Sequence, residues 1–244
     1  MKQHDEKFMD HLKELRKRFI RVLIVFIIVL AAAFMFVPQI LDFITLTSKV
    51  VDVDLNVFNI TDPLLLSLKV ASIAAFIVAF PYIIIELWLF MRPALTKKER
   101  RFVYKYIPMI FILFILGISF SYFVLVPYYV RFSQQLAGNS NLTIVMGANT
   151  YIDFLSKMML YFGLIFQMPM LVFILSYIGI LSSQLLVVIR KYAYFALLIV
   201  CAFLTPPEPV SMGIALIPLA LLYEFSILLC KVNEKKKKKA QLNN

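Results

Sequence analysis

Residues 64–91 read LLLSLKVASIAAFIVAFPYIIIELWLFM and contain only two charged side chains, Lys69 and Glu86. A helix rises about 1.5 Å per residue, so this stretch is longer than the ~30 Å hydrocarbon core of a bilayer. It is also much longer than a transmembrane β-strand and shows no alternation of polar and apolar residues. The stretch therefore predicts a membrane-spanning α-helix.

Other apolar runs repeat this pattern along the chain. They cover residues 19–41, 102–126, 151–178, 192–204 and 211–230. The run at 192–204 reaches only about 20 Å as a helix, which indicates a re-entrant piece or a shortened span. The Pro-rich turn TPPEP at 205–209 follows it. We therefore expect the last two runs to form a short helical hairpin that leans on the four longer ones.

These runs predict an all-α membrane protein with six transmembrane helices, the last two short. We expect one integral membrane domain over residues 1–244. A cytoplasmic amphipathic helix at 1–18 would precede the spans, and a basic tail at 231–244 would follow them. Residues 42–63 and 127–150 are expected to form the two sizeable outer loops.

The composition agrees with a membrane protein. Hydrophobic residues make up 62% of the chain, charged residues make up 16%, and the mean hydropathy is +0.87. Soluble domains carry about 45–50% apolar and about 25% charged residues. An ordinary soluble protein and a disordered chain are therefore excluded. Two cysteines, Cys201 and Cys230, also exclude a disulfide scaffold.

Basic residues are concentrated on one side of the predicted membrane. The net charge is +11, and 21 of the 25 Lys and Arg residues lie on the side of both termini. The positive-inside rule then predicts that both termini are cytoplasmic, where the basic face attracts anionic headgroups. The Ala31–Ala33 stretch is similar to a signal-peptide cleavage site, but the apolar run continues to Val37, so we expect the first span to be retained.

The residues that carry enzyme or metal chemistry are scarce. His4 and His11 are the only histidines, and the two cysteines are 29 positions apart. No metal site of normal spacing, phosphate loop or catalytic triad can be drawn from this inventory. We therefore expect neither an enzyme nor a cofactor, and no nucleic-acid partner.

Two acids, Glu14 and Glu99, lie among the basic residues that the charge pattern places on the inner side. Glu14 is at the edge of the apolar stripe of the first helix, and position alone favours an i,i+4 pair with Arg18. Glu99 is in RPALTKKERR at 92–101, where position favours a solvated loop acid or an acid in the first turn of a helix.

Three further polar residues inside the predicted spans are candidates for a specific role. Glu86 and Glu224 are near the inner interface, where pairing with basic residues and a binding role are equally compatible with the sequence. Gln167 is near the middle of the fourth span. An amide in that position either holds helices together or serves as a docking point for another transmembrane helix.

Several short blocks, taken together in order, resemble the TatC family, the multispanning component of the twin-arginine protein translocase. The blocks are HLKELRKR at 11–18, NITDP at 59–63, FPY at 80–82 with LWLF at 87–90, PAL at 93–95 with ERR at 99–101, FQMP at 166–169 and LTPPE at 204–208. The similarity runs from about His11 to Lys231.

The resemblance implies a curved, glove-like bundle of six helices in a prokaryotic-type plasma membrane. It implies that Glu14 and Glu99 contact the paired arginines of a signal peptide, with Arg16 and Phe90 in the same binding site. For these two acids, the resemblance replaces the interpretation from position alone. The residues that it places at intramembrane polar or partner-docking positions are Gln167, Thr205 and Glu208. The residues that it places at structural turns are Pro63, Pro81, Pro93, Pro206 and Pro207.

Three positions depart from the family pattern. Gln167 stands where Glu is frequent, which removes a possible charge there but keeps a hydrogen-bonding group. Glu208 stands where Asp is common, and Glu86 stands where many relatives have Gln.

The function implied is the core receptor of the twin-arginine translocase, which binds paired-arginine signals of folded proteins and supports export driven by the proton-motive force. The implied partners are TatA-type and TatB-type single-span proteins, the lipid bilayer and further copies of this chain. The alternative is a small-solute secondary transporter, which would usually show related halves and midplane ionisable groups. A membrane-embedded enzyme is a third reading, disfavoured by the missing catalytic groupings.

Overall fold

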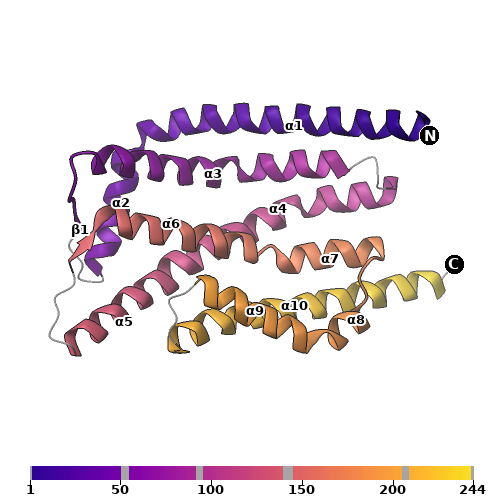
Figure 1. Ribbon diagram of the computed structural model, residues 1–244. Helices are drawn as coiled ribbons and strands as arrows, with labels where there is room; N and C mark the ends of the chain where they lie inside the picture. Colours follow the sequence, from indigo (N-terminus) through magenta and orange to yellow (C-terminus); the bar gives the residue numbers. More distant parts are fainter. Residues whose placement is uncertain (1, 51–54, 92–95, 140–144, 205–208, 243–244) are drawn as a thin grey trace. The chain divides into compact units, whose positions relative to one another are not determined.

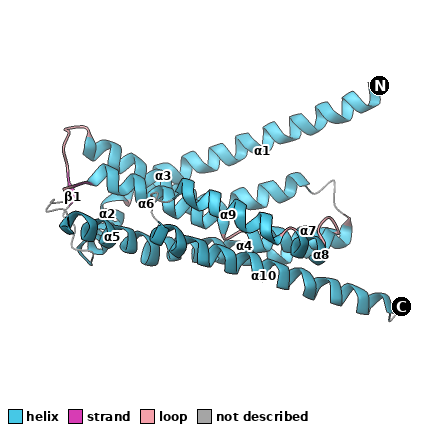
Figure 2. Cartoon of the chain, turned by 60° about the horizontal axis from the view of Figure 1, so that its bottom comes forward, coloured by secondary structure: helices cyan, strands magenta, loops and turns pink. Residues whose placement is uncertain are grey.

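The computed structural model describes residues 2–50, 55–91, 96–139, 145–204 and 209–242, and nearly all of them are helical (Figures 1 and 2). The helices are α1 (Lys2–Met35), α2 (Val37–Val50), α3 (Asp62–Met91), α4 (Lys97–Phe120), α5 (Val126–Asn139), α6 (Ala148–Ile165), α7 (Met168–Ile178), α8 (Ser183–Val188), α9 (Arg190–Leu204) and α10 (Pro209–Leu242). A π-helical turn, Ser121–Leu125, joins α4 to α5. Two short strands, β1 (Leu55–Asn56) and β2 (Met146–Gly147), pair in parallel.

Five helical stretches are long and apolar enough to cross a membrane within the described ranges. They are Leu12–Met35, Asp62–Met91, Tyr104–Gly138, Ala148–Ile178 and Met212–Lys235. The all-α membrane class is therefore confirmed. The predicted short run at 192–204 lies in α9, which has 15 residues and is about 22 Å long.

Several helices extend beyond the predicted boundaries. The predicted amphipathic helix and most of the first span are one continuous helix, α1, but this helix ends at Met35 and not at residue 41. The helix α2 then follows and includes residues 42–50 of the expected outer loop at 42–63, so that loop is also partly wrong. The expected outer loop at 127–150 is partly wrong, because α5 continues to Asn139 and buries Tyr129 and Val130. The expectation that the last helix is short is also wrong, because α10 has 34 residues and continues to Leu242; the Lys, Glu, Ala, Gln and Leu residues that follow Cys230 are good helix formers.

The described chain divides into two compact units. The first consists of Met1–Ile107 with Val145–Ser156, and the second of Pro108–Ile144 with Lys157–Asn244. In the first unit, α1 packs lengthwise against α3, and α2 packs against both (Figure 1).

Polar contacts fix the end of the first unit where α3 and α6 begin. The Asp62 carboxylate accepts hydrogen bonds from the backbone N–H of Phe58 (3.1 Å) and Asn59 (2.9 Å) and from Asn149 Nδ2 (2.7 Å). Lys69 Nζ lies 2.8 Å from Asp153 Oδ1, which ties α3 to α6 two turns further along α3 and one turn further along α6. Pro63 follows directly in the first turn of α3, where a missing N–H has no cost.

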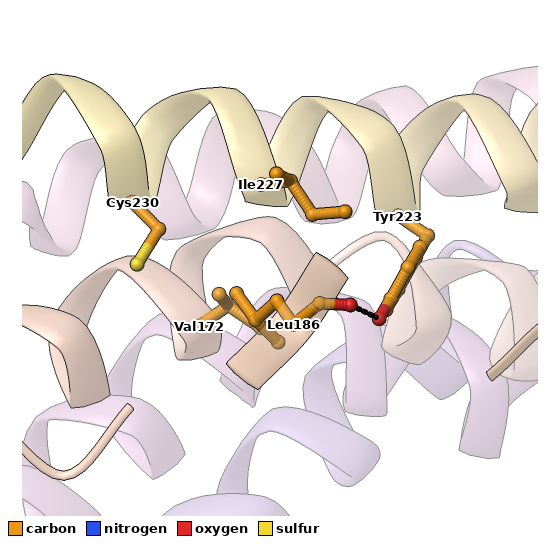
Figure 3. Close-up of a cluster of buried hydrophobic side chains, with 5 residues drawn as sticks. All are labelled: Val172, Leu186, Tyr223, Ile227 and Cys230. Atoms are coloured by element: carbon orange, nitrogen blue, oxygen red, sulfur yellow. Dashed lines mark hydrogen bonds between the residues drawn. The ribbon is translucent and has the colours of Figure 1, made fainter. Parts of the chain in front are cut away.

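In the second unit, α7, α8 and α9 pack against α10. Figure 3 shows the core of this packing, with Val172 of α7, Leu186 of α8, and Tyr223, Ile227 and Cys230 of α10. The Tyr223 hydroxyl donates to the Leu186 carbonyl at 2.8 Å, so the hydroxyl of this cluster is satisfied.

Glycines let α4 and α6 approach closely in the second unit. A Cβ on Gly117 would lie 2.5 Å from the Phe162 carbonyl oxygen, and one on Gly163 would lie 2.8 Å from Phe114 Cε2. Small residues allow such close backbone approach between membrane helices.

Candidate functional site

An ionic cluster joins α1 to α3 in the first unit. Glu14, Arg18 and Arg21 follow one another at spacings of four and three on α1, so they share one face of that helix. Tyr82 and Glu86 are four residues apart on α3 and face the same cluster. Together these side chains form what we call the α1–α3 ionic cluster: Glu14, Arg18, Arg21, Tyr82 and Glu86.

Glu86 is the buried centre of the α1–α3 ionic cluster, with 4% of its side chain exposed. Arg18 Nη1 donates to Glu86 Oε2 at 3.0 Å, and Arg21 Nη1 donates to Glu86 Oε1 at 2.8 Å. The Tyr82 hydroxyl donates to Glu86 Oε1 at 3.0 Å. A carboxylate within a span is costly unless it is paired and hydrogen-bonded, and these three donors meet that requirement.

Glu14 is the more accessible acid of the cluster, with 37% of its side chain exposed. Arg18 Nε and Nη2 both donate to Glu14 Oε1, at 3.1 and 2.5 Å. The i,i+4 pair predicted from position is therefore present. Arg18 uses its third nitrogen for Glu86 and so bridges two carboxylates.

The other residues assigned to signal binding are described less completely. Glu99 is in the first turn of α4, as predicted from position, but its side chain lies outside the described part of the chain. Arg16 is exposed on α1, and its two-residue offset from Glu14 places it on another face of that helix. Phe90 is half-buried and one turn beyond Glu86 on α3, so it continues the row that begins at Tyr82.

Gln167 lies at the break between α6 and α7, and its amide links helices. Nε2 donates to the Ile110 carbonyl of α4 at 3.1 Å and to the Gly163 carbonyl of α6 at 3.4 Å. Gln167 therefore links α4 to α6, which is one of the two roles that the sequence allows for it. Its Oε1 is buried and has no hydrogen-bond partner among the described residues.

Of the residues predicted to mark turns, Pro81 lies inside α3 instead. A proline can remain within a membrane helix where neighbouring helices, Ser or Thr side chains, ordered water or a local change of helical geometry satisfy the carbonyl that it frees. Pro93, Thr205, Pro206, Pro207 and Glu208 lie outside the described residues.

Two further polar clusters bind α10 to its neighbours in the second unit. Arg190 Nη2 donates to Glu224 Oε2 at 3.0 Å, and the Tyr194 hydroxyl donates to Glu224 Oε1. Glu224 is therefore paired with a basic residue, which is one of the two roles that the sequence allows for it. Glu234 accepts from the backbone N–H of Ser183 at 2.7 Å and from its hydroxyl.

Sequence reasoning missed the partners of Glu86 and the role of Glu234. Glu86 pairs with residues 65 and 68 positions away, and Glu234 pairs with one 51 positions away. The available signal was weak: two arginines three residues apart on one helix, and an acid directly before a run of five lysines. Among the described side chains, no group of three or more His, Cys, Asp or Glu residues is placed to hold a metal ion.

The family described as "Sec-independent protein translocase protein (TatC)" matches residues 10–218. The protein TatCy of Bacillus subtilis (strain 168), named a Sec-independent protein translocase protein, is 38% identical over 240 residues, which cover 98% of this chain and 94% of that protein. A protein named TatC from Aquifex aeolicus (strain VF5) is 33% identical over 238 residues, covering 95% of this chain and 98% of that protein.

Solved structures agree with these sequence matches. A crystal structure described as the twin arginine translocase receptor TatC has a TM-score of 0.78 at 31% identity, covering 92% of this chain and 99% of that one. A second structure of the receptor, in DDM, has a TM-score of 0.80, covering 90% of this chain and 98% of that one.

Proposed function

Because this chain belongs to the TatC family of Sec-independent protein translocase proteins, we propose that it is the receptor subunit of a twin-arginine translocase and binds the paired-arginine signals of folded proteins. The observation that carries the proposal is the match of nearly the whole chain to a protein described as a twin arginine translocase receptor. A small-solute transporter is not favoured by this family. The role is transport, and we propose no catalytic step.

We propose that Glu14 and Glu99 receive the two signal arginines. Glu14 supports this role through its chemistry: it already accepts two donors of one guanidinium and keeps 37% of its side chain exposed. Carboxylates recognise guanidinium groups through several directed hydrogen bonds, whereas an ammonium acts as a point charge. Phe90 would line the same site, and Arg16, which lies on another face of α1, would contact the signal beside it.

The topology that goes with this role has six spans, with α9 as the short one, and both termini in the cytoplasm. The one-sided distribution of Lys and Arg supports that orientation in a plasma membrane. A single integral membrane domain and the glove-like bundle of the family stay predictions.

We propose that TatA-type and TatB-type single-span proteins dock in the membrane at Gln167, Thr205 and Glu208. The support comes from Gln167, whose buried Oε1 lacks a hydrogen-bond partner among the described residues. Cross-linking from a cysteine at position 167 to a TatA-type helix tests this docking. Cross-links that form equally from an exposed position on α1, such as 28, would contradict it.

The receptor role is tested by the affinity of a fluorescent twin-arginine signal peptide for the purified full-length chain. Glu14→Ala and Glu99→Ala should each weaken binding about tenfold or more, because each removes a charge-assisted hydrogen bond. The matched control is Glu224→Ala, which removes the same charge from an acid of the second unit and should leave affinity unchanged. Unchanged affinity in both test variants would contradict the site assignment.

A further inference from the structure

Arg18 is hydrogen-bonded to the Glu14 carboxylate, which we propose as the binding group for a signal arginine. Two of its nitrogens are hydrogen-bonded to Glu14 Oε1, and the third is hydrogen-bonded to Glu86 Oε2. Its side chain is only 14% exposed, so the guanidinium is held between the two acids rather than in solvent. A cation that approaches Glu14 therefore meets an acceptor that already holds the same chemical group.

The two acids of the cluster differ in access. Glu86 is 4% exposed and holds Arg18, Arg21 and the Tyr82 hydroxyl, whereas Glu14 is 37% exposed. The two carboxylates and two guanidiniums balance in charge. When another guanidinium binds Glu14, Arg18 can keep its hydrogen bond to Glu86. Arg18 is then not left as an unpaired cation within a span.

We propose that Arg18 determines specificity for arginine at Glu14 and that Glu86 positions Arg18 for this exchange; the proposal rests on the receptor function above. A signal side chain must replace two directed N–H donors on Glu14 Oε1 to displace Arg18. Another guanidinium offers the same planar fork, but a lysine ammonium does not. A carboxylate alone attracts any cation. Competition with Arg18 excludes a lysine side chain and so produces a preference for arginine.

The test measures binding of two peptides, one with paired arginines and one with paired lysines, to the full-length chain. Arg18→Gln should strengthen binding of the lysine peptide about tenfold and of the arginine peptide less, so the preference for arginine falls severalfold. The matched control is Arg21→Gln, which removes the same charge from the same helix face but from a side chain ion-paired to Glu86 rather than Glu14. Arg21→Gln should change the affinities of both peptides by the same factor and so keep the preference for arginine.

Glu86→Gln gives a second prediction from the same geometry. Without the Glu86 charge, Arg18 has only Glu14 as a carboxylate partner in the cluster, so both peptides should bind severalfold more weakly. Arg18→Gln added to Glu86→Gln should restore affinity. Restoration would not occur if Glu86 served only to pack α3 against α1.

The proposal would be overturned if Arg18→Gln and Arg21→Gln changed the peptide affinities by the same factors and left the preference for arginine unchanged. If Arg18→Gln does not yield folded protein, Arg18→Lys keeps the charge but loses the fork, and an unchanged preference in that variant would overturn it equally. Glu14→Ala separates this inference from the receptor role. If Glu14→Ala abolishes peptide binding while Arg18→Gln leaves the preference intact, only the exchange is refuted; if Glu14→Ala has no effect, the receptor site itself is refuted.

Discussion

Replacing Gly117 by Ala should destabilise the second unit more than any other single methyl group added at a described glycine in a helix. The new Cβ would lie 2.5 Å from the Phe162 carbonyl oxygen and 2.9 Å from Phe166 Cβ, whereas ordinary contact begins near 3.4 Å. The obstacle is backbone, so α4 and α6 must separate by about 0.9 Å at this point. Overpacking of this kind costs about 1–3 kcal/mol.

The assay is thermal unfolding of the purified chain in detergent. For a chain of this size, 1 kcal/mol lowers Tm by about 2–4 °C, so Gly117→Ala should lower it by roughly 2–12 °C. Gly163→Ala should have a smaller effect, because the atom it meets is the end of the Phe114 ring. The matched control is Gly213→Ala in α10, which meets nothing within 4 Å and should leave Tm unchanged or slightly raised. Equal Tm values for Gly117→Ala and Gly213→Ala would refute this reasoning.

Three further substitutions test the polar contacts that hold the helix ends. Tyr223→Phe removes the hydroxyl that donates to the Leu186 carbonyl and should lower the free energy of unfolding by about 1 kcal/mol, measured by unfolding in SDS. Glu234→Ala removes two hydrogen bonds to Ser183 and should increase hydrogen exchange at residues 183–186, while Glu234→Gln, which keeps an acceptor, should increase it less. Asp62→Ala should increase exchange at Phe58 and Asn59, whose N–H groups it leaves without their acceptor, and exchange as slow as in the unchanged chain would contradict that role.

The helices of this protein could be predicted because each long apolar run must satisfy its own backbone in lipid. The local pair of Glu14 with Arg18 followed from helical spacing in the same way. The helix α5 could not be predicted, because residues 127–139 are polar overall. Tyr129 and Val130 become buried there only through contacts that the sequence does not specify.

The partners of the intramembrane acids also depended on the fold. A carboxylate such as Glu86 is costly in a span, and from the sequence alone either pairing or a binding role explains it. Only the packing of α1 against α3 brings Arg18 and Arg21 to it. The same holds for Gln167, whose acceptor on α4 is 57 residues away. Sequence reasoning therefore located the polar residues, and tertiary packing decided what each one contacts.

The central claim is that Glu14 recognises a signal arginine directly. A double-mutant cycle tests it most directly, with the unchanged chain and Glu14→Gln each binding signal peptides in which one arginine of the pair is kept or replaced by glutamine. We predict a coupling free energy of about 1–3 kcal/mol between Glu14 and one of the two arginines. Effects that add within about 0.3–0.5 kcal/mol for both arginines would contradict the account.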